Sequence, residues 1–154
     1  MDGLDYGSIL SWWKSLKEDS GGKAELRRAH NPEEVVFLPA YHRLYGKCEP
    51  DNVNKEALSC IAGLCAHIKE NGQREMAKQM AVEISSLRFK KLLAIKDRED
   101  LYHAMVRIIR QLKGVVNVVD LAKTVYWWNE KTKKELAYSY YAKANGEKKE
   151  DSHE

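Results

Sequence analysis

Apolar residues recur every three or four positions in the long segments of the chain, which is the spacing of one face of an α-helix. The clearest segment, 97–113, has a polar side that carries His103, Arg107 and Arg110, and an apolar stripe that consists of Leu101, Met105, Ile108 and Leu112. No segment of useful length alternates between apolar and polar residues as a half-buried strand does. The pattern therefore predicts an all-α fold, a single-domain helical bundle of about eight helices with no significant sheet.

Helix-starting and helix-breaking residues divide the first half of this pattern into elements. Asn31-Pro32 indicates a helix start, since the Asn31 side chain can cap and proline fits the first helical position. Pro39 interrupts the next apolar run. Asn54 is expected to begin a helix that continues to about residue 69. The expected helical ranges are 7–19, 23–29, 40–45, 54–69, 75–84, 86–95 and 97–113.

The last two helices are also predicted from their starting residues. Asp120 is expected to cap the first of them, and Thr132 with Glu135 is expected to form a capping box for the second. The β-branched run 115–119 between Gly114 and Asp120 is short enough to be a buried connection. The Trp12-Trp13 pair near the other end of the chain is expected to belong to the core and an interface rather than to a base-stacking platform.

The charge of the chain is distributed unevenly. Residues 85–143 hold 13 Lys and Arg against 6 Asp and Glu, whereas residues 1–84 hold 11 against 13. Residues 1–143 are expected to form one helical domain, with an N-terminal half of about 1–84 and a basic C-terminal half of about 85–143. The charged tail 144–154 lacks apolar anchors and is expected to be disordered. A basic half beside a slightly acidic one predicts a surface that faces a polyanion.

Other features of the sequence point to a cytoplasmic protein with no membrane partner. No apolar run approaches the roughly 20 residues needed to span a bilayer. The first six residues contain Asp2 and Asp5 and lack the basic region of a secretory signal. Three cysteines form no disulfide pattern, which favours a reducing compartment.

The residue types that an enzyme needs do not converge in this sequence. Cys60 and Cys65 are five positions apart on an expected helix, a poor spacing for zinc, and are better interpreted as buried thiols. The five histidines are scattered, and no glycine-rich phosphate loop or nucleophile elbow is present. We therefore expect no catalytic residue, no metal site and no cofactor.

One enzymatic alternative remains open, a metal-dependent nuclease that uses Asp97 and Asp100. Their position with Glu99 at a helix start makes capping and stabilisation by the helix dipole the better interpretation.

Basic residues at helical spacing are the candidate site, because lysine and arginine contact phosphates without reading sequence. Any one of them can be an ordinary surface cation, and we expect about half of them to contribute to nucleic-acid binding. Arg107 and Arg110 are one turn apart and can reach one nucleic-acid backbone. The candidate nucleic-acid-binding residues are Arg27, Arg28, Arg88, Lys90, Lys91, Arg107, Arg110, Lys123, Lys131 and Lys134.

Several stretches together resemble a known family, and they span about residues 12–141. They are the pair Trp12-Trp13, the stretches 23–29, 32–34 and 38–44, the basic segment 88–93, Asp100-Leu101 with Arg107 and Arg110, the stretches 116–122 and 126–127, and the tyrosine cluster 138–141. This pattern is similar to that of the CasB family, the small subunit of Cascade, the type I-E CRISPR surveillance complex.

The resemblance implies a non-catalytic subunit that acts in antiviral defence. Its implied partners are guide RNA and target DNA, through the displaced strand and the heteroduplex backbone, together with the Cascade backbone subunits, the large subunit CasA and a second copy of itself. The implied role is to stabilise the R-loop formed by guide RNA and target DNA. The alternative is a free-standing helical nucleic-acid-binding protein, which would not co-purify with a ribonucleoprotein.

Overall fold

The computed structural model describes residues 4–48 and 52–151, with side chains as far as Ala142. Over these ranges it contains ten α-helices, one 3-10 turn and two two-residue strands, so the predicted all-α fold is confirmed with more helices than the eight expected. The elements are α1 (Tyr6–Ser15), η1 (Leu16–Glu18), α2 (Ser20–Arg28), α3 (Pro32–Val35), α4 (Pro39–Lys47), α5 (Lys55–Cys65), β1 (Glu70–Asn71), α6 (Met76–Glu83), α7 (Ser86–Leu93), α8 (Arg98–Gln111), β2 (Val115–Val116), α9 (Val118–Tyr126) and α10 (Glu130–Asp151).

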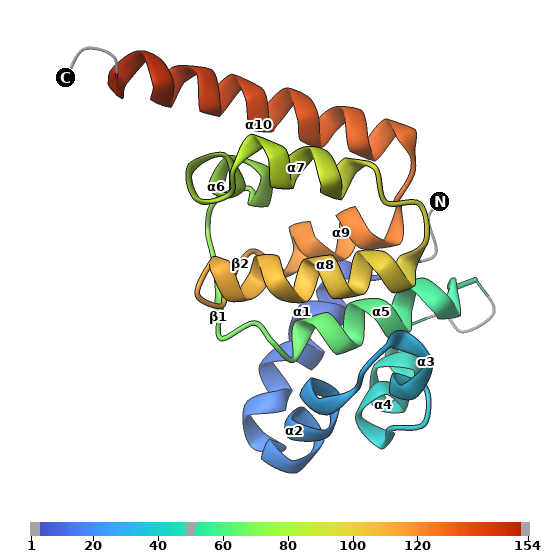
Figure 1. The fold of residues 1–154 in the computed structure, drawn as a ribbon. Coiled ribbons are helices and arrows are strands. Elements are labelled where there is room, and N and C mark those ends of the chain that lie inside the picture. The colour runs from blue at the N-terminus through green and yellow to red at the C-terminus, as the bar shows by residue number, and fades with distance from the viewer. Residues whose placement is uncertain (1–3, 49–51, 152–154) are drawn as a thin grey trace.

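The helices surround α5, whose residues from Ala57 to Cys65 are all buried. It packs against α8 and α9 on one side and against α2, α3 and α4 on the other. Figure 1 shows α10 along one edge of the molecule above α6 and α7, and α2, α3 and α4 at the opposite end. Contacts between α6 and α10 attach this last helix to the rest of the fold.

The core contains the residues that the apolar pattern predicts. The stripe Leu101, Met105, Ile108 and Leu112 of α8 is buried, while His103, Arg107 and Arg110 on the other side are exposed. Trp12 and Trp13 are buried as well, and their indole N–H groups donate to the carbonyl oxygens of Ala40 at 2.9 Å and Ile68 at 3.3 Å. The tryptophan pair therefore joins α1 to α4 and to the chain after α5.

Three predicted caps are confirmed by hydrogen bonds from the first turn of each helix. The side chains of Asn31, Asn54 and Asp97 accept from backbone N–H groups three residues later, at 2.9–3.0 Å. The three residues thus cap the N-termini of α3, α5 and α8, and Pro32 occupies the first position of α3. Each cap satisfies an N–H that has no partner inside the helix.

Two other predicted caps are wrong, because an asparagine three residues earlier takes the role. Asn117, rather than Asp120, caps α9 by accepting the Asp120 N–H at 2.9 Å. The carboxylate of Asp120 instead accepts the N–H of Met76 at the start of α6, at 2.6 Å. Asn129 accepts the Thr132 N–H at 2.9 Å, so α10 begins before the expected capping box of Thr132 with Glu135.

The helix expected over 54–69 is also shorter than predicted, since α5 ends at Cys65. The chain after it forms β1, which pairs in parallel with β2 in the register Glu70 to Val115 and Asn71 to Val116. The predicted buried connection is thus a two-residue strand followed by the start of α9. This short pairing joins the end of α5 to the end of α8.

At the C-terminal end, the backbone of α10 is helical to Asp151, whereas the sequence predicts a disordered tail from residue 144. The side chains of 143–151 and all of 152–154 lie outside the described residues, so the division into domain and tail stays a prediction. Among the helices that the structure describes, none is both long enough and apolar enough to cross a bilayer.

Candidate nucleic-acid interface

Five basic side chains from three segments line one groove, which we call the basic groove. Its volume is about 450 Å³. The end of α2 contributes Arg27 and Arg28, the chain after α5 contributes Lys69, and the end of α8 contributes Arg110 and Lys113. The remaining lining consists of Ala24, His67, Val106, Ile109 and Gly114. Figure 1 shows how the ends of α8 and β2 come together above α2.

Two contacts of Tyr102 link α8 to the end of α2 and to α5. The hydroxyl of Tyr102 on α8 donates to the carbonyl oxygen of Ala29, directly after α2, at 3.3 Å. Gly63 of α5 lies so close to the same ring that a Cβ at this position would be 2.7 Å from Cε1 of Tyr102. A larger residue at 63 would therefore collide with the Tyr102 ring and disturb the packing of α8 against α5.

The other wall is fixed by the end of α8. Lys113 and Gly114 both adopt positive φ, 62° and 78°, and the N–H of Gly114 donates to the carbonyl oxygen of Ile109 at 2.9 Å. This geometry is a common way to end a helix, and it favours glycine. The Gly114 carbonyl oxygen then accepts the N–H groups of Lys69 at 2.8 Å and Glu70 at 3.1 Å. Lys69 and Lys113 are brought to the same groove by this turn.

The cations of the basic groove are free to bind an anion. None of the ion pairs formed among the described residues includes any of the five, and no carboxylate of the described chain lines the groove. Two helix C-termini meet here, each with a partial charge of about −0.5, which five full positive charges outweigh. Arg28 also borders a smaller hollow that Glu25 and Glu34 line, so it lies nearer to carboxylates than the groove lining alone indicates.

The positive potential of the groove acts on His67, a half-buried residue of its lining. Burial lowers the pKa of His67 below 6.5, and the charges of Arg27 and Arg110 lower it further. His67 is therefore mostly neutral at pH 7 in the unbound protein. Burial and the neighbouring cations thus both disfavour the charged imidazolium.

Four of the candidate residues do not line the basic groove but belong to α8 and α7. Arg107 is exposed on α8, one turn before Arg110. Arg88 of α7 donates to the side-chain oxygen of Gln111 at 2.5 Å, which links α7 to the end of α8. Lys90 and Lys91 are exposed on α7.

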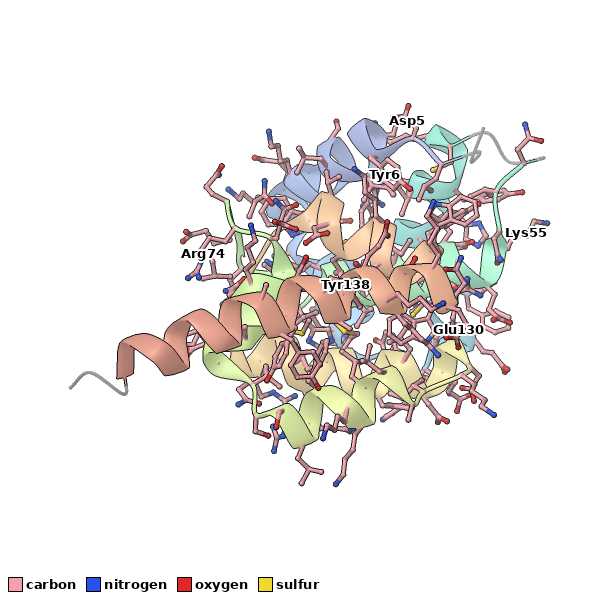
Figure 2. The ribbon with its side chains drawn as sticks, turned by 90° about the horizontal axis from the view of Figure 1, so that it is seen from above. Asp5, Tyr6, Lys55, Arg74, Glu130 and Tyr138 are labelled. Carbon is pink, nitrogen blue, oxygen red and sulfur yellow. The ribbon has the colours of Figure 1, made fainter. Side chains whose placement is uncertain are left out.

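The other three candidates, Lys123, Lys131 and Lys134, are exposed on α9 and α10, away from the groove. Lys123 and Lys131 line a larger hollow of about 950 Å³ that also contains three carboxylates, those of Glu75, Asp120 and Glu135. The ammonium of Lys123 lies 5.3 Å from the ring centre of Tyr6, at the start of α1. Figure 2 shows Tyr6 on the opposite side of α10 from α7. The ten candidates therefore do not share one surface.

Sequence reasoning missed three residues of the basic groove, Lys69, Lys113 and His67. Lys69 and His67 lie after the true end of α5, in a segment that the sequence predicts to be helical. The pairing that brings them to Gly114 involves only two residues on each strand, too few to leave an alternating pattern. Lys113 could have been found from its place beside the helix-ending Gly114.

The residues that would be needed for catalysis have structural roles. Asp97 caps α8 by accepting the N–H of Asp100. Cys60 and Cys65 are buried, as predicted, and burial raises the pKa of each thiol to about 12. Cys48, at the end of α4, is buried too. Among the described residues, no three His, Cys, Asp or Glu side chains gather closely enough to hold a metal ion.

A comparison with protein families decides the identity of the chain. The sequence model of the family "CRISPR-associated protein Cse2" matches residues 22–141, which is most of the chain. This chain belongs to the Cse2 family. Cse2 is the CasB family, so the resemblance inferred from the sequence is confirmed. Cse2 proteins are non-catalytic, which confirms through the family that the chain is not an enzyme.

A solved structure supports the fold of this Cse2 chain. This Cse2 chain superposes with a TM-score of 0.75 on a chain in the crystal structure of Escherichia coli Cascade bound to a PAM-containing double-stranded DNA target. The alignment covers 90% of this chain and 97% of that chain, at 20% sequence identity. At this identity the likeness shows a shared fold. No curated protein sequence matches the chain.

Proposed function

We propose that this Cse2 protein is the small subunit of a type I-E CRISPR surveillance complex, in which its basic groove holds nucleic-acid backbone and stabilises the R-loop. The observation that carries this proposal is the accumulation of five cations without carboxylates on one concave surface. Family membership supports the assembly, and the Cascade structure that shares its fold contains a DNA target. The partners are guide RNA, target DNA, the backbone subunits, CasA and a second copy.

The basic groove suits this role because its contacts are indifferent to sequence. Lysine and arginine bind phosphate oxygens, which every nucleotide carries, whereas base identity is read at base edges. A surveillance complex must hold whichever target its guide specifies. The guide–target duplex is about as stable as the DNA duplex that it replaces, so a few backbone contacts can shift the balance toward the open state.

The remaining candidates fall into two groups outside the groove. Arg107 and Arg88 continue the basic groove along α8 and onto α7, where Lys90 and Lys91 are exposed. The opposite face, with Lys123, Lys131 and Lys134, has carboxylates among its cations. We propose that the groove face binds the backbone of the displaced strand, and that the charge-balanced face contacts protein partners.

The test is to reconstitute the complex with Arg107→Ala and Arg110→Ala together. Both side chains are exposed opposite the core stripe of α8, so folding and incorporation should be unchanged. Loss of about 2–3 kcal/mol of backbone contact would shift the open state by roughly 30–150-fold, because strand exchange is nearly balanced. Protection of the displaced strand from permanganate or nuclease should fall accordingly.

A matched control removes two positive charges elsewhere, with Lys14→Ala and Lys47→Ala, which are exposed on α1 and α4. The control should protect the displaced strand as the unchanged protein does. If the α8 variant also opens and holds the target normally, these arginines are ordinary surface charge. If it fails to enter the complex, they face a protein partner.

A further inference from the structure

The imidazole of His67 is an ionisable group of the basic groove without a hydrogen-bond partner among the described residues. Its backbone N–H donates to the carbonyl oxygen of Leu64 at 3.0 Å, while its side chain lines the groove between the cations of α2 and α8. A neutral imidazole carries one N–H donor and no charge. A protonated one would add a positive charge and a second donor to a groove that already holds five cations.

The occupant of the groove determines which of these two forms is stable. In the unbound protein, every charged group that lines the groove around His67 is positive: Arg27 and Arg28 on α2, Lys69 on its own segment, and Arg110 and Lys113 on α8. These charges disfavour the imidazolium. A phosphate bound among them supplies negative charge and hydrogen-bond acceptors, both of which favour the imidazolium.

We infer that His67 is an anion-binding residue of the basic groove, which takes up a proton when a backbone phosphate of nucleic acid enters and then donates a hydrogen bond to it. This inference rests on the proposed function, since it requires that the groove bind nucleic acid. It identifies one residue that contacts the phosphate, and it predicts that binding depends on pH. The groove becomes a pocket for phosphate in which the sixth positive charge appears only on binding.

The sign of the pH dependence follows from this linkage. The pKa of His67 is lowered in the unbound protein, so binding raises it toward or above its ordinary value of 6.5. Between the two values, binding consumes a proton, and the affinity increases as pH falls. Each unit by which phosphate raises the pKa of His67 corresponds to about a tenfold gain in affinity at low pH. Well above the pKa of the bound form, affinity should no longer change with pH through this residue.

The most direct test measures the titration of His67 itself by nuclear magnetic resonance in the full chain. The imidazole carbon shifts are followed from about pH 5 to pH 8, the range of histidine titration, with and without a saturating oligothymidylate. Thymine gains no proton in this range, so the ligand does not contribute. We expect a pKa below 6.5 in the free protein and a higher one in the bound protein. An equal pKa in both states would overturn the inference.

Variants supply an independent readout of the same coupling. His67→Gln cannot be protonated, so its affinity for oligothymidylate should lose the dependence on pH that the unchanged protein shows. The matched control is His103→Gln, which removes an exposed histidine of α8 and should leave the dependence intact. If His67→Gln keeps the full pH dependence, another group is responsible and the inference is wrong.

Failure of this inference is distinguishable from failure of the proposed function. Binding that weakens with salt but leaves the pKa of His67 unchanged contradicts the proton uptake alone. An absence of oligothymidylate binding at every pH contradicts both.

Discussion

Lys69 lies directly against Gly114 in the lining of the basic groove. The N–H of Lys69 donates to the Gly114 carbonyl oxygen at 2.8 Å, and a Cβ built on Gly114 would be 2.8 Å from Cγ of Lys69. Gly114 also has a φ of 78°, a conformation that L side chains rarely adopt. The glycine thus allows α8 to end and lets the stem of Lys69 lie flat on the turn, with its ammonium at the groove.

We expect Gly114→Ala to destabilise the protein by at least about 1 kcal/mol, from the left-handed backbone alone. The new methyl group should also displace Lys69 and weaken nucleic-acid binding. Chemical denaturation and a binding titration measure the two effects. Gly46→Ala is the control, because nothing lies within 4 Å of its position in α4. That change should be stabilising by about 0.5–1 kcal/mol. Equal midpoints for the two variants would contradict the role of Gly114.

A second prediction separates the core of α8 from its exposed side. Ile108 is only 4% exposed, so Ile108→Ala should cost roughly 2–5 kcal/mol of stability. Arg107 precedes it and is exposed, so Arg107→Ala should change stability by no more than about 0.5 kcal/mol. Urea denaturation of both variants tests the assignment, which is wrong if they have the same midpoint.

A third prediction concerns Asp120, whose carboxylate holds the start of α6. Burial raises the pKa of Asp120 above 3.8, so the folded protein binds this proton more tightly than the unfolded chain. The stability that results is greatest below the unfolded pKa and is lost as pH rises through the folded pKa. The asparagine of Asp120→Asn does not ionise. The stability of this variant relative to the unchanged protein should therefore increase as pH rises from about 4 toward 7.

An exposed carboxylate provides a control of opposite sign. The N–H of Ser8 lowers the pKa of Asp5, so the charged form is favoured by folding. Asp5→Asn should therefore lose stability relative to the unchanged protein as pH rises toward about 4, the ordinary pKa of this carboxyl, and differ from it by a constant amount above that pH. Denaturation midpoints of both variants and of the unchanged protein, measured at a series of pH values below and above about pH 4, decide the matter. A pH-independent difference for Asp120→Asn would mean that its carboxylate is not perturbed.

The sequence is sufficient to predict the helices and the core of this protein because both depend on local spacing. The stripe from Leu101 to Leu112 repeats with the period of a helix, and it is buried. Caps were harder to assign where two capping residues lie three positions apart. Asn117 and Asn129 cap α9 and α10, and they leave Asp120 and Thr132 inside the first turn. Asp120 is free to serve α6, a partner 44 residues away in the chain.

The candidate site was predicted only in part, because a groove depends on contacts between distant segments. Arg27, Arg28 and Arg110 were found from their helices, but nothing in their spacing indicates that they line one surface. Lys69 joins them through the pairing of β1 with β2, between segments 45 residues apart. Conversely, Lys123 and Lys131 cannot be told apart from the groove cations by their sequence pattern, but they lie beside carboxylates on another face.

The central claim is that the basic groove binds nucleic-acid backbone, and the salt dependence of binding tests it most directly. For single strands, the slope of log K against log salt is about −0.7 for each phosphate contact. Arg27→Ala with Arg110→Ala removes one cation from each wall, so the slope should become shallower by about 1.4. The control, Lys14→Ala with Lys47→Ala, should keep the slope of the unchanged protein. Equal slopes for the groove variant and the unchanged protein would contradict the account.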